Sequence, residues 1–265
     1  MKRILFIGAG NMANAISGGI SKSKIVADSN VILFDKNTEQ YAKFNKDFSR
    51  ASDINSGIKE ADYIFISVKP QNIKEVLSEI TVDIKDKVFI SICAGITMAS
   101  IEAVLKDVKL VRAMPNTPLL IGQGVTALCK NQYASYEDFE FVKTIFSSCG
   151  IITEIAENDI NALTAITSSS PAYFYLFVKG MLDGAKTLGF DNSATVEMIC
   201  QTMIGSANMI LTSDKSIDDL ITMVKSPNGT TERALNVFND NNITDTIFKA
   251  MKACADRAEE LSKIN

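Results

Sequence analysis

Small residues near the beginning of the chain have the spacing of a phosphate-binding turn. The apolar run Ile4–Ile7 leads directly into Gly8-Ala9-Gly10-Asn11-Met12-Ala13. In such a turn the first glycine permits a tight bend, the second lets the backbone approach a pyrophosphate, and a small third residue lets a helix pack closely. Unpaired N–H groups at the helix N-terminus then face the phosphates. A glycine-rich turn without a ligand is the alternative. We predict that a dinucleotide is contacted by Gly8, Gly10, Asn11 and Met12.

An acidic residue closes the second apolar run, Val31–Phe34. At this position Asp35 is expected to hydrogen-bond the adenosine ribose, although it follows Gly10 at more than the usual spacing. A solvated turn Asp35-Lys36-Asn37 is the alternative. A carboxylate would repel a 2′-phosphate, and Lys36 would offset part of that repulsion. The sequence therefore predicts NADPH or NADH as the cofactor and favours NADH.

Two loops rich in hydroxyl groups precede predicted helices, at residues 167–171 and 226–231. Helix capping accounts for one serine or threonine in each. The additional hydroxyls, at a helix N-terminus, suit an anion such as a carboxylate. We therefore expect a small carboxylic acid as substrate.

The composition excludes several other chemistries. The 265 residues include no histidine, so a Ser-His-Asp triad, a Cys-His pair and a histidine-ligated metal are all excluded. Five cysteines, without C-x-x-C spacing, indicate neither zinc nor a redox pair and fit a reducing cytoplasm. A net charge of -4 favours neither nucleic acid nor an anionic membrane as partner. No apolar run reaches the ~20 residues that cross a bilayer.

Strands alternate with helices in the first part of the chain, which predicts a doubly wound parallel sheet. Apolar runs indicate strands at 4–7, 31–34, 63–68, 88–92 and 109–114, then two closing strands at 125–129 and 151–154 around a helix at 135–148. The turns that follow such strands converge on the sheet edge where ligands bind. These turns supply Ala94, Gly95 and Asn116 as further candidates.

Strand-like runs disappear from about residue 157, and the remainder reads as five or six helices. Expected helices span 170–188, ended by Gly189, then 192–211, one begun by the capping box Ser216-x-x-Asp219, and 244–263. We predict a dinucleotide-binding domain at 1–156 and a helical substrate-binding and dimerisation domain at 157–265. Several helices are apolar on more than one face, which predicts a homodimer through the helical domain.

Six motifs carry a resemblance to a known family: Gly8–Ala13, Val68–Gln71, Ala94–Thr97, Met114–Pro118, Ser170–Tyr173 and Ser226–Thr231. In this order they make the chain similar to pyrroline-5-carboxylate reductase over nearly its whole length. The resemblance implies an N-terminal Rossmann domain and a helical domain that interlocks into a dimer, in some members assembled into a decamer. It also implies hydride transfer from NAD(P)H to the C=N carbon of 1-pyrroline-5-carboxylate, which completes proline biosynthesis.

The resemblance assigns roles to particular residues. Cofactor contacts fall on Val68, Lys69, Pro70 and Asn116, and Asn116 is also expected beside the substrate. The substrate carboxylate loop falls on Ser226, Gly229, Thr230 and Thr231, with Thr231 near the imine nitrogen as the catalytic residue. An imine nitrogen is readily protonated by solvent, so a site without histidine is acceptable. Holding donor and acceptor carbons close can contribute about 7–11 kcal/mol at best.

The chain departs from the family pattern at Ser168, Ser170 and Asn228, where glycines are usual. Either positive φ is not needed at the serines, or the serines narrow the pocket; Asn228 tolerates the left-handed region. One alternative function is a β-hydroxy acid dehydrogenase with Lys179 or Lys186 as catalytic lysine, but neither lies in the expected Gly-x-x-Gly-x-x-x-Lys context. Another is a non-catalytic dinucleotide sensor, against which the retained threonine loop argues.

Overall fold

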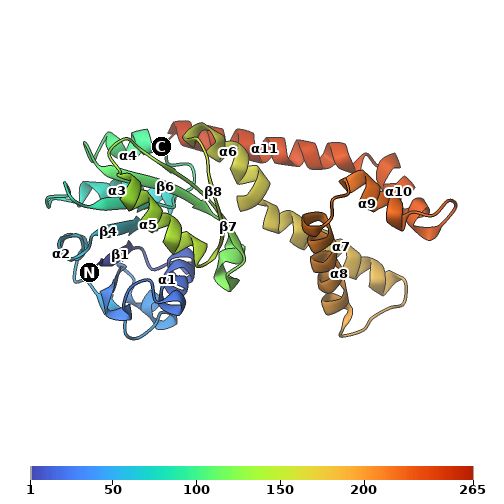
Figure 1. The fold of residues 1–265 in the computed structure, drawn as a ribbon, viewed down its shortest axis with the longest axis horizontal. Coiled ribbons are helices and arrows are strands. Elements are labelled where there is room, and N and C mark those ends of the chain that lie inside the picture. Colours follow the sequence, from blue (N-terminus) through green and yellow to red (C-terminus); the bar gives the residue numbers. More distant parts are fainter. Residues whose placement is uncertain (1, 265) are drawn as a thin grey trace. The chain divides into compact units, whose positions relative to one another are not determined.

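The chain divides into two units in the computed structural model, which describes residues 2–264. The first unit comprises residues 2–169 and 254–264, and the second comprises residues 170–253. The first unit contains the sheet, and the second is entirely helical (Figure 1). The prediction of an α/β part followed by an all-helical part is therefore confirmed.

An eight-stranded sheet has the strand order β3-β2-β1-β4-β5-β6-β7-β8. Strands β1 to β6 run parallel to one another, as predicted, whereas β7 is antiparallel to β6 and β8 is parallel to β7. The predicted doubly wound parallel sheet is therefore confirmed for β1 to β6, and the two closing strands, β7 and β8, run in the opposite direction. The strands are β1 (Ile4–Ile7), β2 (Val31–Phe34), β3 (Ser49–Arg50), β4 (Tyr63–Ile66), β5 (Val88–Ser91), β6 (Lys109–Pro115), β7 (Gly124–Lys130) and β8 (Gly150–Glu154).

Helices cover both faces of this sheet. Helices α1 (Asn11–Ser23) and α5 (Tyr136–Ser147) pack on one face, and α2 (Ile54–Glu60), α3 (Ile73–Ser78) and α4 (Met98–Glu102) pack on the other (Figure 1). Strands buried on both faces read as continuous apolar runs, which is why β1, β4 and β5 lack polar alternation. Single 3-10 turns occur at Asp28–Asn30, Thr38–Lys43, Pro70–Asn72, Thr117–Ile121 and Glu157–Asp159.

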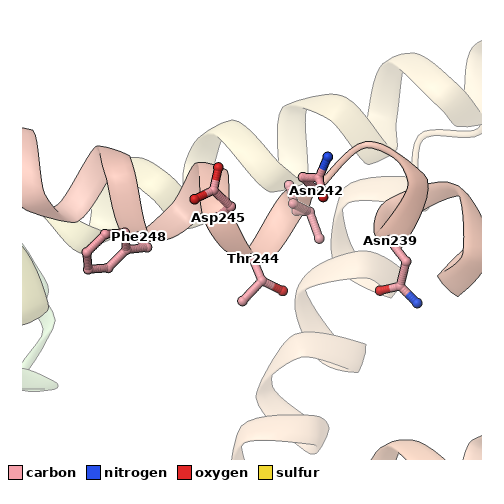
Figure 2. Close-up of a pocket in the computed structure, with 6 residues that line it drawn as sticks. Asn239, Asn242, Thr244, Asp245 and Phe248 are labelled. Atoms are coloured by element: carbon pink, nitrogen blue, oxygen red, sulfur yellow. The ribbon is translucent and has the colours of Figure 1, made fainter.

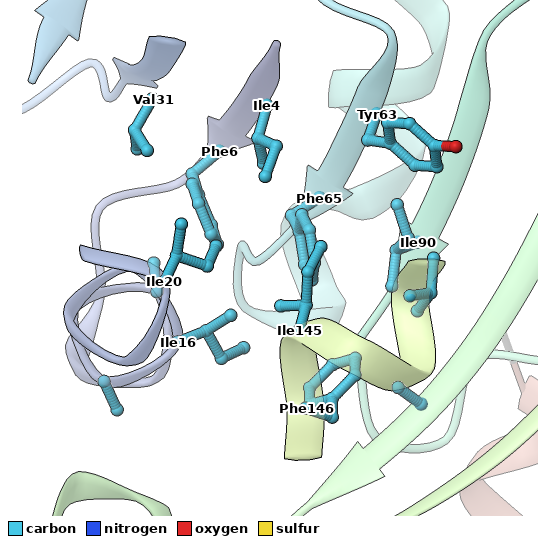
Figure 3. Close-up of a cluster of buried hydrophobic side chains, with 14 of the residues drawn as sticks. Ile4, Phe6, Ile16, Ile20, Val31, Tyr63, Phe65, Ile90, Ile145 and Phe146 are labelled. Atoms are coloured by element: carbon cyan, nitrogen blue, oxygen red, sulfur yellow. The ribbon is translucent and has the colours of Figure 1, made fainter. Parts of the chain in front are cut away.

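Aromatic side chains fill the core beneath the first turn. The rings of Phe6 and Phe65 stack with centroids 4.6 Å apart, and Figure 3 shows Ile16 of α1 and Phe146 of α5 packed around them. This packing fixes the position of β1 relative to α1, and therefore the shape of the turn between them.

The second unit consists of α7 (Ser170–Thr187), α8 (Thr195–Thr212), α9 (Ile217–Val224), α10 (Thr230–Asp240) and the first part of α11 (Ile243–Ile264). Gly189, at φ +80°, ends α7 as predicted, and the capping box of Ser216 and Asp219 begins α9. Before α7 the chain forms α6 (Ile160–Leu163) and a π-helical turn at Thr164–Ser168.

Burial is sparse in the second unit. Of its described residues only Pro171, Thr195 and Ile199 are buried, while Leu188 and Leu211 are 87% and 80% exposed. Exposed apolar surface on this scale marks an interaction surface rather than a finished domain.

Candidate functional site

The glycine turn after β1 is fixed by its own packing. Gly8 has φ +97°, and a Cβ atom there would lie 2.8 Å from the carbonyl carbon and oxygen of Ser67. The Ser67 hydroxyl lies 2.7 Å from the Gly8 oxygen. Both the backbone conformation and the close approach of Ser67, directly after β4, therefore require glycine at this position.

Gly10 is different, because the protein leaves space beside it. Its φ is -76°, and a Cβ atom there would meet only the Ser67 oxygen, at 3.9 Å. Gly10 is the N-cap of α1 and provides no side-chain cap for the first N–H groups of that helix. An open backbone and an uncapped helix N-terminus fit the pyrophosphate of a dinucleotide.

Asp35 lies beside this turn at the end of β2. Its carboxylate accepts hydrogen bonds from the N–H of Ala9 at 2.7 Å and from the N–H of Asn37 at 2.8 Å. The Tyr41 hydroxyl accepts the Asp35 N–H at 2.8 Å. The carboxylate is thus held at the edge of the turn, where Asp typically meets the ribose.

Lys36, the next residue, is directed to α3. Its Nζ lies 2.7 Å from a carboxylate oxygen of Glu75 and 2.7 Å from one of Glu79. Hydrogen bonds to these two carboxylates raise the pKa of the Lys36 ammonium above its ordinary value. In the structure, therefore, Lys36 forms ion pairs with two glutamates of α3 and its C-cap.

The turns after β4 and β5 lie beside the glycine turn because these strands follow β1 in the sheet. The Cys93 thiol donates to the Val68 carbonyl at 3.3 Å, which holds the first of these turns, and Lys69 and Pro70 continue it. Gly95, next to Ala94, has φ +73°. The contacts predicted between these residues and a cofactor stay predictions.

Asn116, after β6, is 7% exposed, and both of its amide atoms bind backbone. Its Oδ1 accepts the Val125 N–H at 2.8 Å, and its Nδ2 donates to the Thr167 carbonyl at 3.0 Å. Asn116 therefore ties β7 to the π-helical turn. Its predicted contacts with cofactor and substrate stay predictions.

A buried ion pair lies on the same strand, and sequence reasoning missed it. The Arg112 guanidinium, 3% exposed, binds the Glu157 carboxylate at 2.8 Å. The same carboxylate oxygen accepts the Met98 N–H at 2.7 Å. The arrangement joins β6 to the first turn of α4 and to the segment where the helical region begins. An arginine within an otherwise apolar strand was the signal that could have revealed it.

The serines that replace family glycines adopt ordinary conformations. Ser168 and Ser170 are absent from the described non-glycine residues with positive φ, so glycine is not required there. The Ser169 hydroxyl accepts a hydrogen bond from the Cys254 thiol at 3.2 Å. Asn228 has φ +57°, which confirms that this asparagine occupies the left-handed region.

The threonine loop of the second unit ends at an uncapped helix N-terminus. Gly229 is the N-cap of α10 and offers no side chain, while Thr230 and Thr231 form the first turn. A Cβ atom at Gly229 would lie 2.2 Å from the Ser226 hydroxyl oxygen. Glycine therefore brings the Ser226 hydroxyl close to the free N–H groups of α10. Hydroxyls and N–H groups so placed can bind a carboxylate.

The hollow shown in Figure 2 lies at the other end of α10. Its volume is about 420 Å³, and its lining comes from the turn between α10 and α11: Asn239, Asn242, Ile243, Thr244, Asp245 and Phe248. It contains none of the residues predicted for the site.

One of the two lysines considered for the alternative dehydrogenase, Lys179, forms an ion pair on its own helix. Lys179 is exposed on α7 and pairs with Asp183 at 2.6 Å. Within residues 2–264 no three His, Cys, Asp or Glu side chains gather as metal ligands would. Among the same described residues, every helix is too short or too polar to cross a bilayer.

Comparisons with known proteins agree along the whole chain. Residues 157–261 match the family model for pyrroline-5-carboxylate reductase dimerisation, and residues 3–95 match the model NADP oxidoreductase coenzyme F420-dependent. Pyrroline-5-carboxylate reductases of Escherichia coli and Pseudomonas aeruginosa are 35% and 36% identical, over 99% and 98% of this chain and 99% and 97% of theirs.

Solved structures give the same result. Pyrroline carboxylate reductase of Plasmodium falciparum with NADP bound is 30% identical, covers 98% of both chains and superposes with a TM-score of 0.92. The Coxiella burnetii pyrroline-5-carboxylate reductase is 31% identical over 98% of both chains, with a TM-score of 0.87.

Proposed function

The chain belongs to the pyrroline-5-carboxylate reductase family, and from that premise we propose which of its residues carry each part of the reaction. The protein is an NAD(P)H-dependent oxidoreductase that reduces the C=N bond of 1-pyrroline-5-carboxylate to give L-proline. The nicotinamide dinucleotide supplies a hydride to the ring carbon, and the nitrogen takes a proton. The β-hydroxy acid dehydrogenase and the sensor are not favoured.

The glycine turn carries the proposal for the coenzyme. The space beside Gly10 and the uncapped N-terminus of α1 support a pyrophosphate there. Asn11 and Met12 begin that helix. The neighbouring turns would contact the ribose and nicotinamide, and they are formed by Val68, Lys69 and Pro70 after β4 and by Ala94 and Gly95 after β5. We assign these residues to coenzyme binding.

We propose that NADH is preferred over NADPH. The Asp35 carboxylate is held beside the glycine turn by two backbone N–H groups. A charged carboxylate near a 2′-phosphate costs roughly 1–4 kcal/mol per charge pair. The Lys36 ammonium forms ion pairs with Glu75 and Glu79, so these two carboxylates already share its charge.

The threonine loop carries the proposal for the substrate. Ser226, Gly229, Thr230 and the uncapped N–H groups in the first turn of α10 would surround the substrate carboxylate, at about 1.5–3 kcal/mol for each charged hydrogen bond. Thr231 is half-buried in the first turn of α10 and would orient the imine nitrogen through its hydroxyl. Asn116 would contribute to this site by holding the start of β7 against the π-helical turn.

The exposed apolar helices of the second unit and the match of residues 157–261 to the dimerisation model both support a homodimer. Light scattering at micromolar concentration tests this: a mass of two chains, or ten for a decamer, is expected, and a single-chain mass would contradict it. Five unpaired cysteines support a cytoplasmic location.

The decisive experiment follows absorbance at 340 nm with 1-pyrroline-5-carboxylate and each coenzyme. We expect turnover with both and a higher kcat/KM with NADH. Thr231→Val should lower kcat at least tenfold, whereas Thr231→Ser, which keeps the hydroxyl, should retain most activity. Failure to oxidise proline or thioproline with NAD+ at high pH, with dinucleotide binding intact, would favour the sensor instead.

A further inference from the structure

The ion pairs of Lys36 lie beside the residue expected to meet the coenzyme ribose. Lys36 follows Asp35 directly, and its ammonium contacts two carboxylates at 2.7 Å each. Asp35 itself is bonded to the glycine turn through the Ala9 N–H. Lys36, the cation next to the aspartate that is expected to bind the ribose, is therefore already paired with two carboxylates.

Those acidic partners are held in place by their own helix. Glu75 lies in the first turn of α3, and Glu79 is the C-cap that follows its last residue. The Asn55 side chain donates to the Glu79 carbonyl at 2.9 Å and accepts the Thr81 N–H at 2.9 Å. The end of α3 is thus fastened to α2, so the two carboxylates form a prepared partner for the ammonium.

Other cations near this edge have different partners. Lys43 binds the side-chain oxygens of Asn11 at 3.2 Å and Gln40 at 2.8 Å. The Arg50 guanidinium lies 4.9 Å from the centre of the Tyr41 ring. Within residues 2–264 neither Lys43 nor Arg50 pairs with a carboxylate, so of these three cations it is Lys36 whose charge is balanced by acidic side chains.

We propose that Glu75 and Glu79 are specificity-determining residues, which hold Lys36 on α3 and so withhold it from a 2′-phosphate. This inference rests on the proposed function, because it concerns the same coenzyme site. With Lys36 so held, the side chains of Asp35, Glu75 and Glu79 outnumber the single cation among them. A coenzyme without a 2′-phosphate avoids this excess of negative charge.

The test is a binding measurement on the full-length protein, with NAD+ and NADP+ as probes in a calorimeter. The double variant Glu75→Gln/Glu79→Gln should shift the ratio of the two dissociation constants toward NADP+ by about three- to tenfold, which lies within the range for two exposed ion pairs. Adding Lys36→Met to this double variant should abolish the shift. The shift should also shrink in 1 M salt, since exposed charges are then screened.

The chain offers a matched control. Lys143 of α5 also pairs with two glutamates, Glu140 and Glu154, on the opposite face of the sheet from α3. The variant Glu140→Gln/Glu154→Gln also removes two negative charges, but it leaves the ion pairs of Lys36 intact. It should therefore leave the ratio of the two dissociation constants unchanged.

Three results would overturn the inference: no shift in the first double variant, an equal shift in the control, or a shift that persists with Lys36→Met. Because the ratio is measured by binding, intact NAD+ affinity in these variants would show that the proposed coenzyme site survives even if the role of Glu75 and Glu79 is refuted. A wild-type protein that binds neither dinucleotide would refute the proposed function and this inference together.

Discussion

The Asp35 carboxylate accepts the Ala9 N–H at 2.7 Å, so the end of β2 is joined to the turn that follows β1. One side chain therefore supports the shape of the glycine turn and sets the charge beside it. Because of this hydrogen bond, Asp35 holds the glycine turn in shape even before a coenzyme binds.

Replacing this carboxylate tests its influence on coenzyme choice. Asp35→Ser should raise the NADPH/NADH ratio of kcat/KM about fivefold or more, because a repulsive charge is removed. The activity with NADH should fall, because a ribose partner is lost. Steady-state kinetics with both coenzymes measure this. Asp47→Ser, which removes an exposed carboxylate elsewhere, is the control; an unchanged ratio in Asp35→Ser would show that Asp35 does not read the ribose.

The two glycines of the turn should respond differently to alanine. Gly10→Ala should leave the melting temperature nearly unchanged, because the protein has room for the methyl group, yet weaken NAD+ binding at least tenfold. Gly8→Ala should lower stability by several kcal/mol, because its Cβ meets backbone and its φ is positive.

Gly18 of α1 is the control for both, since no atom beyond its chain neighbours and its own helix backbone lies within 4 Å of the Cβ position. Gly18→Ala should stabilise the helix by about 0.5–1 kcal/mol. Calorimetry and thermal melts measure these effects. A Gly10→Ala protein that binds NAD+ as well as wild type would contradict the assignment of that space to the pyrophosphate.

The buried ion pair should contribute more than a surface one. Glu157→Ala leaves the buried Arg112 guanidinium without its carboxylate, which should cost about 3–5 kcal/mol of unfolding free energy. Glu154→Ala removes a carboxylate from the exposed pair with Lys143 and should cost below about 1 kcal/mol. Urea unfolding followed by circular dichroism compares the two; equal losses would mean that Arg112 finds another partner.

The buried thiols should resist modification. Burial raises the pKa of Cys93 to about 12 and that of Cys129 to about 11, from an ordinary 9.0. At pH 8 both are almost entirely protonated in the folded protein, and the thiolate is the reactive form. Iodoacetamide followed by peptide mass spectrometry should label them far more slowly than in urea. Equal rates in the two conditions would place these thiols at the surface.

The same shifts make stability depend on pH. In the unfolded chain these thiols ionise near pH 9, whereas in the folded chain they stay protonated. Their contribution is therefore fully present below pH 9 and is lost as pH rises toward 11 to 12. The midpoint of urea unfolding, measured from pH 8 to pH 11, should fall, and by less in Cys93→Ala/Cys129→Ala.

The central strands could be predicted from the sequence because each is a short apolar run that ends at a turn. Strand β3, only Ser49–Arg50, has too few residues to carry a pattern. The direction of β7 could not be predicted either, since an apolar run does not show which way the strand runs in the sheet. The short segment from Pro115 to Gly124 was the missed clue, because a parallel crossover needs a dozen or more residues.

The candidate site was predictable in part for similar reasons. Gly8 and Asn228 were identified because positive φ has a strong residue preference. The backbone bonds of Asn116 and the ion pair of Arg112 join segments far apart in the chain, which periodicity does not reveal. The glutamate partners of Lys36 come from a later helix and could not be predicted for the same reason.

Helix α11 contributes its last part, from Cys254, to the sheet-containing unit, although the chain leaves that unit at Ser170. In topological terms the helical unit is an insertion, and the nucleotide-binding fold is discontinuous in sequence. The Cys254 thiol, bonded to Ser169, marks where the two separated pieces meet again. A stop codon after Ala253 would consequently damage the coenzyme-binding half, and an expression fragment of that half needs both pieces, joined by a linker.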